Sequence, residues 1–212
     1  MFQLSKIKDR VFLLRFDREY DLAMSFLRYQ EFYESLNPRF LGKKFTIAEY
    51  MAWYSADRNP KVPVFSYVKD WGGFNLPLKI IDQVNDLGID DPNHYDALMK
   101  GVNGLIKDNG NDDPYLIGTC GEGMGGAFDH EMSHALFYTN EEYRDSCFIE
   151  FNRLPQDVQA EYKYALYHMG YPEKVYVDEL QAYIVGGNNI IYNNENNEYF
   201  AKAIIELHKK HK

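Results

Sequence analysis

The stretch YLIGTCGEGMGGAFDHEMSHALFY, residues 115–138, constrains the fold more than any other part of the chain. Its first six residues are mostly apolar or β-branched and predict a strand. Glycines at positions 121, 123, 125 and 126 follow and predict a tight turn. Apolar residues then recur at helical spacing, from Met132 to Phe137. The segment therefore predicts a strand, a glycine turn and a helix in immediate succession.

The predicted helix carries two histidines, His130 and His134, with Glu131 directly after the first. Residues four apart lie on one face of a helix, so both imidazoles can reach one ion. This arrangement is typical of zinc sites in which the metal lowers the pKa of a bound water to about 7 and the glutamate takes its proton. Chance would supply the pattern in roughly one such chain in a hundred. The alternative is an amphipathic helix with solvated or hydrogen-bonded histidines.

The strand, the glycine turn and the HEMSH helix together resemble the zincin superfamily of zinc metallopeptidases. The resemblance covers about residues 115–185 and does not extend to the first 110 residues. It implies that YLIGTC, residues 115–120, forms the edge of a small sheet along which an extended peptide binds. An ordinary buried strand is the alternative.

A catalytic zinc keeps three protein ligands and an open position. The metzincin subclass would need glycine at 137 and histidine at 140, but Phe137 and Asn140 stand there. The gluzincins take a glutamate from a downstream helix, often followed by an alanine three residues later. Glu179 in VDELQAYIV matches that pattern and lies 179 − 134 = 45 residues after His134. The resemblance therefore implies a gluzincin-like Zn²⁺ site with Glu179 as its third ligand.

Two features near Glu179 depart from the family pattern or leave it open. Gluzincins often have an aspartate four residues after the glutamate, where it orients a ligand histidine, but this chain has Tyr183. Asp178 and Asp129 are possible substitutes for that aspartate. Asp178 and His168 are also the reserve candidates for the third ligand.

Hydrolysis through a tetrahedral intermediate needs a hydrogen-bond donor for the developing oxyanion. Several gluzincins use a tyrosine or histidine near the third-ligand helix, and here Tyr171, Tyr176, Tyr183 and His168 lie nearby. We favour Tyr176. Most of the 18 tyrosines are nevertheless expected to be packing residues with satisfied hydroxyls.

The remaining patterns predict a helix-dominated α+β fold. Strands are expected at 10–16 and 147–151, with a short one near 64–68, and the predicted helices cover 18–36, 47–55, 78–86, 93–107, 155–170, 176–185 and 197–210. Thr46 is a plausible N-cap. The length of 212 residues favours a single domain, with residues 1–114 as an N-terminal lobe of unassigned role and 115–212 as the zincin-like core with a helical C-terminal lobe.

Composition excludes several classes of function. The formal net charge is −9 without a basic patch, which argues against a nucleic-acid partner. The apolar run near the N-terminus is too short for a signal peptide or a membrane span. The two cysteines, Cys120 and Cys147, predict no disulfide framework. We expect a cytoplasmic protein, although a non-classical secretion route would leave no such signal.

These observations predict a zinc-dependent peptide-bond hydrolase acting on a peptide or protein substrate. His130, His134 and Glu179 would bind Zn²⁺, Glu131 would be the general base and Tyr176 the oxyanion donor. One alternative is a zincin-fold protein whose zinc serves structure or partner recognition without catalysis. A second is a metal-free protein that binds a partner through its aromatic surface. Substrate, cleavage position and oligomeric state are left open.

Overall fold

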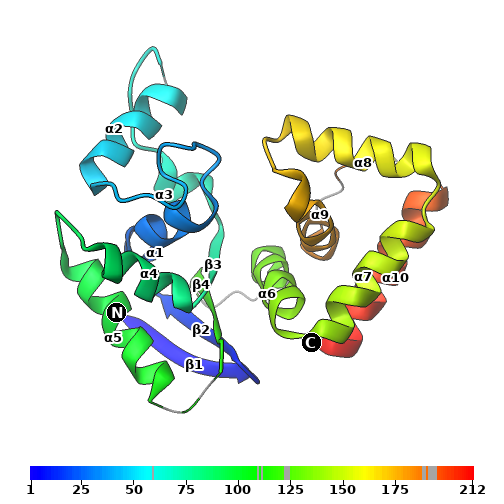
Figure 1. Cartoon of the computed structure of the whole chain (residues 1–212), viewed down its shortest axis with the longest axis horizontal. Helices are drawn as coiled ribbons and strands as arrows, with labels where there is room; N and C mark the ends of the chain where they lie inside the picture. Colours follow the sequence, from blue (N-terminus) through cyan, green and yellow to red (C-terminus); the bar gives the residue numbers. More distant parts are fainter. Residues whose placement is uncertain (59, 109, 111, 122–124, 188–189, 191–194) are drawn as a thin grey trace. The chain divides into compact units, whose positions relative to one another are not determined.

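The computed structural model describes residues 1–58, 60–108, 110, 112–121, 125–187, 190 and 195–212 (Figure 1). Gly123 of the predicted glycine turn lies outside these residues. The chain divides into two compact units, Met1–Gly123 and Met124–Lys212. The first is mixed α and β, and the second contains helices and no strand among its described residues, so the helix-dominated α+β prediction is confirmed.

A four-stranded sheet organises the first unit, in the order β1-β2-β4-β3. β1 and β2 form an antiparallel hairpin, β2 and β4 run parallel, and β4 and β3 run antiparallel. The bounds are Phe2–Lys8 for β1, Val11–Phe16 for β2, Gly73–Pro77 for β3 and Tyr115–Cys120 for β4. The strand predicted at 10–16 is confirmed as β2.

β4 lies inside the sheet, so the prediction that YLIGTC forms a sheet edge is wrong. Its backbone pairs with β2 on one side and with β3 on the other. The physical reason is that β4 is too apolar for an exposed sheet edge. Its first five residues are all buried. Gly118 leaves room for α1, since a Cβ there would lie 2.4 Å from a ring carbon of Phe26. Such an apolar strand is stabilised by neighbours on both edges and both faces.

Among the described residues of the first unit, five helices accompany the sheet: α1 (Glu19–Glu34), α2 (Ile47–Arg58), α3 (Tyr67–Asp70), α4 (Lys79–Leu87) and α5 (His94–Lys107). The four longer ones were predicted. Thr46 is the N-cap of α2, where its hydroxyl accepts from the Glu49 amide at 3.2 Å and its own amide donates to the Glu49 carboxylate at 2.8 Å. The strand predicted near 64–68 is wrong, because the chain enters α3 there and the third strand begins only at Gly73.

The second unit contains α6 (Gly126–Thr139), α7 (Glu141–Arg153), α8 (Gln156–His168), the short 3₁₀ helix η1 (Glu173–Val175), α9 (Tyr176–Val185) and α10 (Glu195–His211). The strand predicted at 147–151 is wrong, since those residues belong to α7. Tyr143, Cys147 and Phe151 are buried at four-residue spacing, while Phe148 and Ile149 are exposed. The apolar run thus follows the period of a helix.

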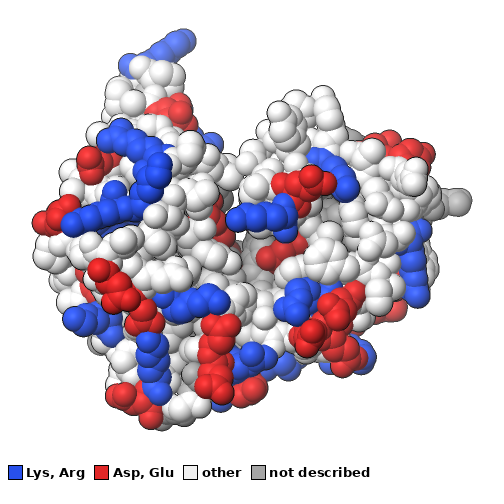
Figure 2. Space-filling model, viewed as in Figure 1, with Lys and Arg blue, Asp and Glu red and all other residues white. Residues whose placement is uncertain are grey.

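None of the described helices is long and apolar enough to cross a membrane. On the face drawn in Figure 2, lysine and arginine side chains are interspersed with aspartate and glutamate over the surface. This mixture agrees with the net charge of −9 and with the absence of a basic patch from the sequence.

Candidate metal centre

The predicted metal ligands lie on two helices of the second unit that approach each other closely, α6 and α9. Glycines make this approach possible. A Cβ on Gly126 would lie 2.5 Å from the carbonyl oxygen of Gly186, and a Cβ on Gly186 would lie 3.1 Å from the Cβ of His130. Ala182, the alanine three residues after Glu179, is fully buried and leaves room for α6. The first turns of α6 and the last turn of α9 therefore meet at His130.

His130, His134 and Glu179 converge, as the sequence predicted. Their three ligand atoms all lie within 4.8 Å of one another. The Nε2 atoms of the two imidazoles are 3.2 Å apart, and the His134 Nε2 is 4.0 Å from Oε2 of Glu179. Tetrahedral zinc with bonds of about 2.0–2.2 Å holds neighbouring ligand atoms about 3.3 Å apart. The donor set and its spacing thus fit a zinc ion after small side-chain adjustments.

Each imidazole has a hydrogen-bond partner that can fix its tautomer. Nδ1 of His134 lies 2.8 Å from Oδ1 of Asp178, and His130 hydrogen-bonds to the backbone of Ala182. When His134 donates its Nδ1 proton to Asp178, its Nε2 carries a proton only in the imidazolium form and donates it to Nε2 of His130, 3.2 Å away. Two lone pairs facing each other at this distance would instead need a cation between them. A contact such as that of Asp178 to the second ring nitrogen is typical of metal-binding histidines.

The surrounding charges favour a cation at this point. Burial disfavours the charged form of His134, but the charges of Asp178 and Glu179 and the hydrogen bond to Asp178 outweigh it and hold the pKa well above 6.5. Burial raises the pKa of Glu179 to about 7, against the opposing charge of His134 and with further contributions from Asp178 and Glu131. Burial and the charge of His134 lower the pKa of His130 to about 3. The site therefore offers a negative potential and one neutral imidazole.

Glu131 is buried on α6 next to His130. Its charge contributes to the raised pKa values of His134, Glu179 and Tyr183, so its carboxylate lies within electrostatic range of all three. This position is compatible with the predicted proton-accepting role.

Two of the tyrosines considered from the sequence lie at the site. The hydroxyls of Tyr171 and Tyr183 are 3.0 Å apart, and Tyr171 also hydrogen-bonds to the carboxylate of Glu179. The ring of Tyr183 packs edge-on against His130, with centroids 5.1 Å apart. Tyr176, the favoured oxyanion donor, is buried at the first position of α9, and its role stays a prediction.

The reserve candidates take other positions. Asp178 contacts His134 on the nitrogen away from the other ligands, which supports it as the substitute for the missing aspartate. His168 is exposed at the end of α8, beside the rings of Tyr164 and Tyr167. Asp129 forms an ion pair with Lys212. The carbonyl at Ala182 has no side-chain signal, so sequence reasoning missed it as a partner of His130.

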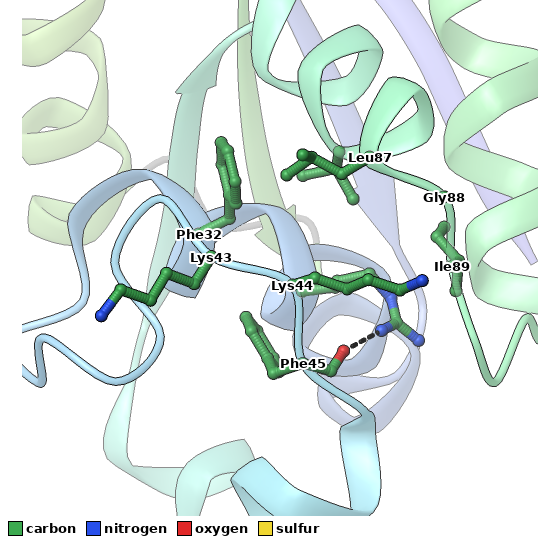
Figure 3. A pocket seen from close by; sticks show the side chains of 9 residues that line it. Phe32, Lys43, Lys44, Phe45, Leu87, Gly88 and Ile89 are labelled. Carbon is green, nitrogen blue, oxygen red and sulfur yellow. Dashed lines mark hydrogen bonds between the residues drawn. The ribbon is translucent and has the colours of Figure 1, made fainter.

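The first unit has a small apolar pocket, to which α1, α4 and the segment from Lys43 to Phe45 contribute (Figure 3). Two of the three cations around it are engaged by other groups, since Arg28 donates to the Phe45 carbonyl at 2.7 Å and Lys44 pairs with Asp90 at 2.6 Å. This lining offers packing but no group of catalytic or metal-binding side chains.

Comparisons with protein-family models, with curated proteins and with solved structures find no match to this chain.

Proposed function

We propose that the second unit binds Zn²⁺ through His130, His134 and Glu179, and that the protein is a gluzincin-type hydrolase of peptide bonds. One observation carries the proposal: three donor atoms from two helices lie within 4.8 Å of one another. The partner on the far nitrogen of His134, the backbone hydrogen bond of His130 and the neighbouring carboxylate of Glu131 add support.

Zinc bound by three protein groups supplies a Lewis acid and an activated water at its open position. The chain itself supplies the proton transfers. A carboxylate oxygen of Glu131 accepts the proton of the attacking water and then donates it to the nitrogen of the leaving amine. Asp178 holds His134 in the tautomer with a free Nε2.

The hydroxyl pair of Tyr171 and Tyr183 supplies a second candidate for the oxyanion donor, beside Tyr176. Tyr171 can donate to Glu179, which leaves the proton of Tyr183 for Tyr171 or for a substrate carbonyl. A donor at this position would stabilise negative charge as it develops. Replacing each tyrosine by phenylalanine distinguishes the three, since loss of the true donor lowers kcat by about 100-fold or more.

Metal analysis and peptide cleavage test the proposal together. Purified wild-type protein should contain one zinc per chain, and a His130→Ala variant should contain none. On a peptide library, Glu131→Gln should keep the zinc and lose cleavage by at least about 100-fold. Glutamine preserves the shape of the side chain, so a loss of turnover with zinc retained identifies the carboxylate as the base.

The outcomes separate the proposed hydrolase from its rivals. A wild-type protein that holds zinc, cleaves nothing in the library and works equally well with Glu131→Gln in a partner-binding assay would be a non-catalytic zinc protein. Wild-type protein that takes up no zinc from a zinc-buffered solution would contradict both zinc proposals and leave the metal-free partner-binding protein.

A further inference from the structure

We infer that Tyr143 and Gln181 are positioning residues for the metal ligand His134, which they reach through Asp178. The inference rests on the proposed metal site and assigns a role to two residues outside it. A chain of three hydrogen bonds joins them. The Tyr143 hydroxyl donates to Oε1 of Gln181 at 2.7 Å, Nε2 of Gln181 donates to Oδ1 of Asp178 at 3.1 Å, and the same Oδ1 lies 2.8 Å from Nδ1 of His134.

The direction of these bonds determines how the Gln181 amide is oriented. A tyrosine hydroxyl that donates its proton needs an acceptor, so the carbonyl end of the amide faces Tyr143. The NH₂ end must then face Asp178, where it stabilises the carboxylate. Asp178 in turn accepts the Nδ1 proton of His134, which leaves Nε2 as the lone-pair donor to a metal. Each step selects one of two possible orientations for the next group.

The outer part of the chain is buried, so water cannot replace Tyr143 or Gln181, whereas the side chain of Asp178 is 28% exposed. Tyr143 and Gln181 are both 0% exposed, and His134 is 6% exposed. Asp178 and Gln181 are three residues apart and share one face of α9, while Tyr143 comes from α7 and His134 from α6. Packing alone would be satisfied by apolar side chains of similar size. A buried polar chain that ends on the far nitrogen of a metal ligand provides orientation as well.

Two substitutions interrupt the chain at different points. Tyr143→Phe removes the donor to Oε1 of Gln181, so the amide loses the hydrogen bond that holds its buried carbonyl end in place and is less firmly positioned against Asp178. Gln181→Leu removes the amide with little change in volume. Loss of an outer-shell partner typically weakens metal binding by about 10- to 100-fold. Because these residues act one and two bonds beyond Asp178, we expect the lower end, about 10-fold weaker zinc binding for each.

The matched control is Tyr162→Phe, which removes a hydroxyl from another buried tyrosine of the second unit. Tyr162 lies on α8 and is 4% exposed. All variants are compared with the wild type by competition for zinc against a chromophoric chelator. The visible absorption of the Co²⁺-substituted proteins reports the geometry of the ligands. Thermal melts of the metal-free proteins show whether each variant is folded.

A further measurement reports the hydrogen bond of His134 directly and needs no metal. In the metal-free protein, the hydrogen-bonded Nδ1 proton of His134 is observed by ¹H–¹⁵N NMR of the histidine rings, assigned by its loss in His134→Ala. We expect this proton to exchange faster with solvent in Tyr143→Phe and Gln181→Leu, and to be unchanged in Tyr162→Phe.

Weaker zinc binding, an altered Co²⁺ spectrum and faster proton exchange in both chain variants, with Tyr162→Phe like the wild type, support the inference. It is overturned if folded Tyr143→Phe and Gln181→Leu bind zinc as tightly as the wild type with an unchanged Co²⁺ spectrum; the proposed zinc site then stands. If the wild type binds neither zinc nor Co²⁺, the proposed function and the positioning role fall together.

Discussion

The two units differ in how their buried charged side chains are compensated. In the first unit, the side chain of Arg28 is 4% exposed and is fully occupied by acceptors from the same chain. Its guanidinium lies 2.9 Å from Asp96, 2.9 Å from Asp91 and 2.7 Å from the Phe45 carbonyl. The buried carboxylate of Glu31 likewise accepts a hydrogen bond from Tyr67 at 3.0 Å. These buried groups satisfy one another.

In the second unit, three carboxylates surround two imidazoles instead. Glu131 and Glu179 are buried, Asp178 is partly buried, and their charges act on His134. The imidazole nitrogens that face each other have no built-in cation between them other than a proton. We infer that the charge set around Arg28, which is balanced within the chain, serves the fold. We propose that the carboxylates beside the two facing imidazoles of the second unit receive an external cation.

We expect the largest change in the free energy of unfolding when the buried cluster around Arg28 is broken. Arg28→Met should destabilise the first unit by about 3–5 kcal/mol, because Asp96 is left as an uncompensated buried charge. Urea unfolding followed by tryptophan fluorescence measures it, since both tryptophans, Trp53 and Trp71, lie in the first unit. Zinc content should not change.

The control for this substitution is Arg153→Met, which breaks a pair on α7 between Arg153, whose side chain is 61% exposed, and Glu150, whose side chain is 14% exposed. Because the guanidinium lies in solvent, the pair is expected to contribute about 0–1 kcal/mol, so this variant should unfold near the wild-type midpoint in thermal melts. Equal destabilisation by Arg28→Met and Arg153→Met would remove the basis for treating the Arg28 cluster as structural.

A smaller effect on stability is expected at the proposed zinc site of the second unit. Zinc at about 100 times its dissociation constant should stabilise the second unit by about 2.7 kcal/mol, because it binds the folded form. Thermal melts by far-ultraviolet circular dichroism, with zinc and with a chelator, measure the difference. His134→Ala should abolish the zinc effect. If the wild type melts at the same temperature with and without zinc, the prediction is contradicted. The carboxylates around His130 and His134 would then need no external cation.

The smallest effect concerns Glu31 and pH. Burial raises the pKa of Glu31 above its ordinary value of 4.5, so the folded state holds a proton that the unfolded state has lost. This contribution to stability is complete below pH 4.5 and is lost as pH rises through the folded pKa. The loss is at most about 1.4 kcal/mol per pH unit.

Glu31→Gln cannot titrate and keeps an acceptor for the Tyr67 hydroxyl. Tryptophan-monitored urea unfolding from about pH 4 to about pH 8 should therefore show a stability that falls less with pH in this variant than in the wild type. If the stability of the two proteins falls equally with pH, the pKa of Glu31 is not raised in the folded state and the prediction is wrong.

Much of the local structure could be predicted from the sequence, and the failures share a cause. Helix periodicity located α6 and α9, and Thr46 was recognised as a cap because capping depends on neighbours in sequence. The run at 147–151 was assigned to a strand because five residues show too little of a period, and only the buried spacing across the whole of α7 decides it. Short apolar runs are ambiguous in this way.

At the candidate site too, residues close in sequence could be placed from their spacing, whereas contacts between helices could not. His130, Glu131 and His134 lie within one helical turn, so their spacing alone places them on adjoining positions. Glu179 was chosen by resemblance, and its distance from His134 became known only from the packing of α6 on α9. Gln181 and Tyr143 gave no signal, because a glutamine and a tyrosine in helices have many possible roles until their partners are known.

The helices, the shared face of the two imidazoles and the acidic balance of the chain follow from short-range geometry and composition, so the residues alone are enough to predict them. Three features emerge only when the chain is folded: β4 has neighbours on both sides, Asp178 contacts His134, and two glycines bring α6 against α9. These are contacts between residues far apart in the chain. They depend on how the apolar surfaces of whole elements fit together, and that fit is not encoded in any one local pattern.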